Sequence, residues 1–133
     1  MDQSKPFVIY QEECPTETRP HESNPYVRWW TLVSSDRTKS DSITLGVAEI
    51  APGDESAMRF HWHDPSEIYF VLSGEGVVRI EDEDYPVGPG ATIFIPGGSW
   101  HATRNTGSGI LKMIYAFGVP SFEEVVYHYD TRA

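Results

Sequence analysis

The sequence is poor in cysteine, in basic side chains and in long apolar runs. Cys14 is the single cysteine, so an internal disulfide is excluded and a reducing compartment is favoured. Only 10 basic side chains stand against 20 acidic ones, and the net charge of −10 argues against nucleic acid or a membrane as partner. No apolar run has the length of a signal peptide or a membrane span, so we expect a cytoplasmic protein.

Ten prolines and eleven glycines divide the sequence into short apolar runs. This pattern is typical of many short strands and few helices, and we expect an all-β protein built as a barrel or jelly roll. The 133 residues suffice for one domain with a full hydrophobic core. We expect residues 1–35 to form an N-terminal arm and first strands that pack on the barrel or on a dimer partner. Residues 36–133 are expected to form the barrel itself.

Three histidines and one glutamate stand out in the second half of the sequence. His61 and His63 are two residues apart, so on a β-strand both side chains point to the same face. Glu67 follows a short turn, and His101 follows a second turn rich in glycine. Imidazole and carboxylate groups suit one divalent transition metal such as iron, manganese, nickel or zinc. The alternative stays open that each histidine is only a polar residue on the solvent-facing side of a strand.

Strand alternation places two further side chains near the predicted metal site. Arg59 shares the face of His61, where it either clamps a substrate carboxylate or is an exposed cation at a strand start. Tyr69 shares the face of Glu67, where it is either a general base or acid, or a core tyrosine. By the same alternation, Phe60 and Trp62 face away from the metal, which suits a contact between subunits.

The spacing of these residues resembles that of the cupin superfamily. Two cupin motifs are matched, the first at Gly53, His61, His63, Glu67 and Gly74, the second at Gly90, Pro96, Gly98, His101 and Asn105. The gap from Gly53 to His61 is seven residues instead of five, and this is the one departure. The resemblance implies a double-stranded β-helix barrel that holds one metal ion. It also implies a homodimer, since small cupins commonly form one.

Segments outside the motifs are similar to the small cupin lyases that cleave dimethylsulfoniopropionate to dimethyl sulfide and acrylate. These segments are residues 27–29, 45–53, 66–69 and 124–127. The resemblance implies a metal on the substrate carboxylate, Tyr69 as the base for the α-proton, and Tyr127 as a second catalytic tyrosine. Aromatic faces hold a sulfonium well, and Trp29, Trp100 and Tyr115 are candidates for this contact.

Two other functions stay open. A cupin dioxygenase or isomerase that acts on a small organic acid, diketone or thiol would use the same four ligands, and Tyr69 would then be structural. A non-catalytic cupin that binds a small ligand is also consistent with these residues. Product formation without O2 separates the lyase from the dioxygenase, and the absence of turnover identifies the binding protein.

Overall fold

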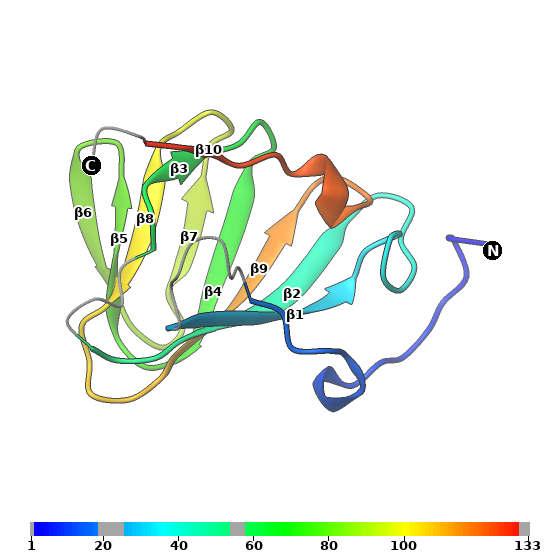
Figure 1. The fold of residues 1–133 in the computed structure, drawn as a ribbon, viewed down its shortest axis with the longest axis horizontal. Coiled ribbons are helices and arrows are strands. Elements are labelled where there is room, and N and C mark those ends of the chain that lie inside the picture. Colours follow the sequence, from blue (N-terminus) through cyan, green and yellow to red (C-terminus); the bar gives the residue numbers. More distant parts are fainter. Residues whose placement is uncertain (1, 19–25, 54–57, 131–133) are drawn as a thin grey trace.

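The computed structural model describes residues 2–18, 26–53 and 58–130, which form two antiparallel five-stranded sheets (Figure 1). This confirms the predicted all-β fold class. The first sheet has the order β1 (Val27–Val33), β2 (Thr44–Ile50), β9 (Leu111–Phe117), β4 (Glu67–Ser73) and β7 (Thr92–Ile95). The second has the order β10 (His128–Tyr129), β3 (His61–Trp62), β8 (His101–Asn105), β5 (Gly76–Ile80) and β6 (Glu83–Val87). Two short 3-10 helices, η1 (Gln11–Glu13) and η3 (Phe122–Glu124), lie outside the sheets, and no helix in the described ranges is long and apolar enough to cross a membrane.

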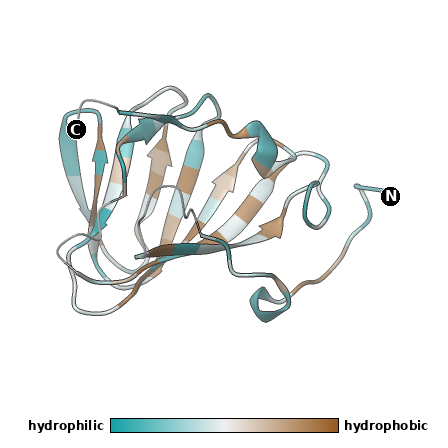
Figure 2. Ribbon diagram, viewed as in Figure 1, coloured by the Kyte–Doolittle hydropathy of each residue, from teal (hydrophilic) through white to brown (hydrophobic). Residues whose placement is uncertain are grey.

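Strict alternation decides which side chains enter the space between the sheets. Residues 67, 69 and 71 of β4 are buried, whereas residues 68, 70 and 72 are exposed. Strand β9 buries residues 111, 113, 115 and 117 in the same way. The main core contains Ile50, Val71, Val78, Ile95, Leu111 and Phe117. Figure 2 shows a hydrophilic β6, which is the edge strand of the second sheet. The core lies between the two sheets, because the buried side chains of β4 and β9 share one face of their strands.

Turns between strands set the position of β8 against β3. The amide of Gly98 donates a hydrogen bond to the carbonyl of His63 at 2.9 Å, which ties together the loops that follow β3 and precede β8. Gly98 has a φ of 82°, a left-handed conformation that glycine adopts without strain. This turn brings His101 opposite His61 as its register partner.

The N-terminal arm, residues 2–18, packs on the outer face of β1 and β2. Ile9 and Cys14 contact Trp30 and Val47 in a small apolar cluster separate from the main core. A β-bridge at Glu17 joins the arm to β1. Strand β1 is itself hydrogen-bonded to β2, so the division of the chain at residue 35 stays a prediction. The rest of the predicted arm, residues 19–25, lies outside the described residues.

Candidate metal centre and its cavity

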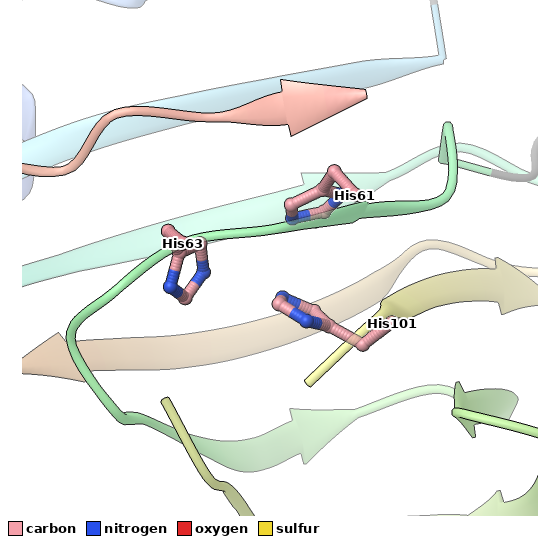
Figure 3. Close-up of side chains that lie close together, drawn as sticks. All are labelled: His61, His63 and His101. Carbon is pink, nitrogen blue, oxygen red and sulfur yellow. The ribbon is translucent and has the colours of Figure 1, made fainter. Parts of the chain in front are cut away.

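Three buried histidines meet between the sheets. His61 on β3 faces His101 on β8, and His63 follows β3 directly. Their ligand nitrogens lie within 4.8 Å of one another, and each residue is at most 2% exposed. Figure 3 shows the three side chains gathered around a common point. The cluster can therefore hold a metal ion.

Backbone carbonyls fix the orientation of all three rings. The Nδ1 atoms lie 2.7 Å from Arg59 O for His61, 2.9 Å from Pro65 O for His63, and 2.9 Å from Ser99 O for His101. Because a carbonyl oxygen only accepts hydrogen bonds, each Nδ1 carries a hydrogen and donates it. A neutral ring then keeps the lone pair on Nε2. Histidines that bind a metal through Nε2 commonly have this arrangement, in which the other ring nitrogen, Nδ1, donates a hydrogen bond.

Glu67 borders the histidine cluster from β4. Its Oε1 lies 3.2 Å from His63 Nε2 and 3.4 Å from His101 Nε2, and the residue is 3% exposed. Burial raises the pKa of Glu67, but His101 and His63 outweigh burial and lower that pKa overall. Burial likewise lowers the pKa of His63, where the hydrogen bond and charge of Glu67 outweigh it and raise that pKa. Glu67 is thus a buried anion. A proton or a metal cation between its Oε1 and the Nε2 atoms of His63 and His101 must neutralise this charge.

Two observations favour a metal cation in this position. His101 Nε2 is buried, and no described atom forms a hydrogen bond with it. Burial and the neighbouring His101 lower the pKa of His61 to about 3, so its imidazole is neutral, which is the form that binds metals. The donor set of three imidazole nitrogens, to which Glu67 would add a carboxylate oxygen, fits iron, manganese, nickel and zinc alike.

A cavity between the sheets borders the candidate metal site at His61 and Glu67, whereas His63 and His101 do not line it. The open volume of this cavity is about 60 Å³, which is room for a small ligand. Seven of the residues singled out in the sequence line it, namely Trp29, Arg59, His61, Glu67, Tyr69, Tyr115 and Tyr127. Tyr129 lines it as well, from β10. Residues from both ends of the sequence therefore meet in one cavity.

Trp100 lies elsewhere. Successive side chains of a strand point to opposite faces, so the inward direction of His101 sends the preceding Trp100 outward. There it stacks on Phe60, with ring centroids 5.6 Å apart. Trp62 similarly stacks on His128, with centroids 4.1 Å apart. Trp100 is therefore not among the residues that line the cavity, where a substrate contact was predicted for it. Phe60 and Trp62, which were expected at a subunit contact, pack on side chains of their own chain.

Two tyrosines from distant parts of the chain face the histidines. Tyr127 stacks on His61, with ring centroids 4.8 Å apart and an angle of 21° between the rings. Tyr69 is 3% exposed, and burial raises its pKa well above the usual value, with further contributions from Glu67 and Tyr127. Tyr69 is therefore a neutral phenol that donates a hydrogen, and it becomes a base only where added positive charge lowers its pKa.

Arg59 lies at the exposed mouth of the cavity. Its guanidinium carbon is 4.2 Å from the centre of the Tyr129 ring, which is a cation–π contact. Of the described residues that line the cavity, Arg59 is the cation at the mouth and Glu67 the carboxylate inside. An anionic ligand therefore meets a positive charge on entry.

Sequence reasoning missed part of the cavity wall. The additional lining residues are Val27, Ala48, Met58, Met113 and Phe122. Alternation along β9 from Tyr115 could have identified Met113. Phe122 comes from η3, and no periodic pattern in the sequence connects this short helix with the cavity.

Comparison with known proteins agrees with this architecture. Residues 46–117 match the cupin domain family. The chain belongs to the cupin family. It is 32% identical to the dimethylsulfoniopropionate lyase DddW of Ruegeria pomeroyi, over 96% of this chain and 82% of that protein. These findings confirm the resemblance predicted from the motifs.

Other cupins are similar too. The solved cupin-2 domain Rru_A2000 of Rhodospirillum rubrum has a TM-score of 0.75 and 20% identity, over 96% of this chain and 84% of that chain. The 5-nitrosalicylic acid 1,2-dioxygenase of a Bradyrhizobium species is 33% identical, over 60% of this chain and 42% of that protein. Relatives of this cupin thus include a lyase and a dioxygenase, which fits a metal-dependent enzyme that acts on small molecules.

Proposed function

We propose that this cupin is a metal-dependent lyase that cleaves dimethylsulfoniopropionate, or a closely related small carboxylate, by β-elimination. The observation that carries the proposal is the burial of Tyr69 in the same cavity as His61 and Glu67. A base within reach of a metal-bound carboxylate is what elimination needs. Similarity to DddW over most of both chains supports the choice of substrate.

The reaction begins with the proton on the carbon next to the substrate carboxylate. Tyr69 first releases its own hydroxyl proton to water, and the resulting phenolate oxygen takes the α-proton; the electron pair of the broken C–H bond forms the double bond of acrylate. The C–S bond breaks, and its electron pair leaves on dimethyl sulfide. When held by the three histidines and Glu67, a divalent ion supplies the Lewis acid for the carboxylate. The positive charge of the sulfonium lowers the pKa of Tyr69 at the moment when the base is needed.

The cavity wall suits both ends of this substrate. Trp29 and Tyr115 each contact Phe122, with ring centroids 6.2 Å and 6.0 Å apart. Aromatic faces attract a sulfonium and exclude water from it. Tyr127 lies next to Phe122 on the side of the histidines, with centroids 6.3 Å apart, and is the second tyrosine of the site. We assign the first contact with an incoming carboxylate to Arg59.

An anaerobic assay tests the proposal. Purified protein of measured metal content is mixed with dimethylsulfoniopropionate without O2, and dimethyl sulfide and acrylate are quantified. Tyr69→Phe should keep the metal and the fold but lose roughly 100-fold or more of the rate, the usual contribution of a general base. Tyr85→Phe is the matched control, because Tyr85 is exposed on β6 outside the cavity. Absence of product from metal-loaded protein contradicts the lyase, and full activity of Tyr69→Phe contradicts the assignment of Tyr69 as its base.

The similarity to a dioxygenase favours a second candidate function. In a dioxygenase the cavity would hold a small organic acid, diketone or thiol beside the same metal ligands. Oxygen uptake with such a substrate, at a rate that Tyr69→Phe largely retains, would support this function. Metal-loaded protein that binds a small carboxylate and turns nothing over would instead be a binding protein.

We also propose a cytoplasmic location. Cys14 is buried and unpaired with any other cysteine, as suits a reducing compartment. Fractionation of cells that express the full chain tests this, and recovery outside the cytoplasm contradicts it.

A further inference from the structure

We propose that Glu17 and Arg37 are positioning residues, which hold the aromatic wall of the cavity in place from outside it. The aromatic wall consists of Trp29, Tyr115 and Phe122. The effect of the two residues on the substrate rests on the proposed function, because this wall is the surface assigned to the sulfonium. Neither Glu17 nor Arg37 is among the described residues that line the cavity, so any effect on a bound substrate must pass through the wall.

Two neighbours hold the carboxylate of Glu17. The hydroxyl of Thr31 donates a hydrogen bond to Glu17 Oε2 at 2.6 Å. The guanidinium of Arg37 donates from Nη2 to Glu17 Oε1 at 2.8 Å and from Nε to both carboxylate oxygens at 3.1 Å. The side chains of Glu17 and Arg37 are 18% and 32% exposed, so water competes only in part with this forked contact. Such a pair fixes geometry in a way that a freely exposed ion pair does not.

On the side of β1, the Glu17 segment contacts the wall through its main chain. The amide of Glu17 donates to the carbonyl of Trp29 at 2.8 Å, and the amide of Trp29 donates to the carbonyl of Glu17 at 3.0 Å. Thr31, which is 2% exposed, pairs in register with Gly46, and Gly46 pairs with Tyr115 on its other side. Because Gly46 has no Cβ, the hydroxyl end of the Tyr115 ring occupies that space. Glu17 and Thr31 therefore lie directly behind two residues of the wall.

Arg37 contacts the wall from another side, through Phe122 on η3. Its guanidinium carbon lies 5.2 Å from the centre of the Phe122 ring, which is a cation–π contact. Figure 1 shows η3 beside the loop that joins β1 to β2, and the Phe122 amide donates a hydrogen bond to the buried Ser34 hydroxyl of that loop at 2.9 Å. A helix of three residues has too few internal hydrogen bonds to fix its own place. Packing against Arg37 and Ser34 therefore helps to decide where Phe122 lies.

Phe122 connects Arg37 with the rest of the wall. Its ring centroid lies 6.2 Å from that of Trp29 and 6.0 Å from that of Tyr115. A shift of Phe122 therefore changes the surface on which a sulfonium would rest. The sulfonium charge is full in the bound substrate and decreases as the C–S bond breaks, so the wall attracts the substrate at least as strongly as the transition state. Loosening the wall should raise KM and leave kcat nearly unchanged.

Steady-state kinetics of the metal-loaded full chain test the proposal. Arg37→Gln and Glu17→Gln should each raise KM for dimethylsulfoniopropionate roughly 5- to 10-fold, with kcat within about twofold of the parent. Glu17→Gln keeps the main-chain bridge to Trp29 and should leave the arm docked. The double variant should raise KM no further than either single variant, because both changes remove the same contact.

Arg28→Gln is the matched control on the same strand. Arg28 forms an ion pair with Glu49 at 2.9 Å, and its guanidinium carbon lies 5.4 Å from the centre of the Trp30 ring. Trp30 packs in the small apolar cluster of the arm, and neither Arg28 nor Trp30 is among the described residues that line the cavity. This variant loses the same kinds of contact and should keep the parent KM. A general loss of stability would lower Tm and the amount of active protein but not raise KM, so thermal melting of each variant separates the two effects.

Hydrogen exchange followed by mass spectrometry gives a readout that needs no turnover. The amides of residues 122–125 are all hydrogen-bonded, so they report on the seating of η3. Exchange there should be faster in Arg37→Gln and Glu17→Gln than in Arg28→Gln. Unchanged exchange, or a KM no higher than that of Arg28→Gln, would overturn the positioning role. A parent protein that forms no product, with faster exchange in the two variants, would remove the lyase function and support the positioning role.

Discussion

The burial of His61 predicts how acid destabilises the metal-free protein. In the unfolded chain the pKa of His61 is about 6.5. In the folded chain, burial and the neighbouring His101 lower this pKa to about 3. Below pH 6.5 the unfolded state therefore holds one more proton than the folded state. The free energy of unfolding should fall by about 1.4 kcal/mol per pH unit in this window, or by about 2 to 3 kcal/mol between pH 6.5 and 4.5.

The neighbouring groups act outside that window. The pKa of His63 is raised, so its contribution is fully present below pH 6.5 and is lost as pH rises through the higher folded value. The pKa of Glu67 is lowered, so its contribution is present above pH 4.5 and is lost as pH falls through the lower folded value. The interval from pH 6.5 to 4.5 thus reports mainly on His61.

Urea unfolding of chelator-treated protein at several pH values in this interval measures the slope. The matched control is His61→Gln, which keeps a polar side chain that does not titrate and should remove most of the slope. Equal stability at pH 6.5 and 4.5 in the parent protein would refute the reasoning. An unchanged slope in His61→Gln would show that another group is responsible.

Three other substitutions probe the site and its support. His101→Ala should lose most of the bound metal, measured by mass spectrometry of the purified protein, and near-full occupancy would end its assignment as a ligand. Ala48→Leu should fill much of the cavity, whose open volume is about 60 Å³, and should abolish substrate turnover while metal content stays at the parent level. Gly46→Ala should lower the free energy of unfolding by about 2 to 3 kcal/mol, because the new Cβ would clash with the Tyr115 hydroxyl and lie 2.6 Å from the backbone oxygen of Trp30. Gly118→Ala is its control, since no described atom lies within 4 Å of that Cβ; equal stability of the two variants would contradict the clash.

The motif spacing predicted that the three histidines of the candidate metal centre meet. His61 and His63 share a face because strand side chains alternate, and a glycine-rich turn returns the chain so that His101 pairs with His61. Alternation also predicted that Tyr69 lies with Glu67 in the interior. These are local properties of a β-strand, so they can be inferred from the order of residues alone.

What the sequence by itself determined was therefore the fold class, the family and the faces of the central strands. Tertiary structure alone decided which distant segments meet: Phe122 and Tyr127 close the cavity, and Trp100 turns away onto Phe60. It also decided that the arm covers β1 and β2 and leaves Phe94 exposed. Periodicity gives the direction of a side chain relative to its own strand, but contact between segments depends on the packing of the whole chain, which no local pattern contains.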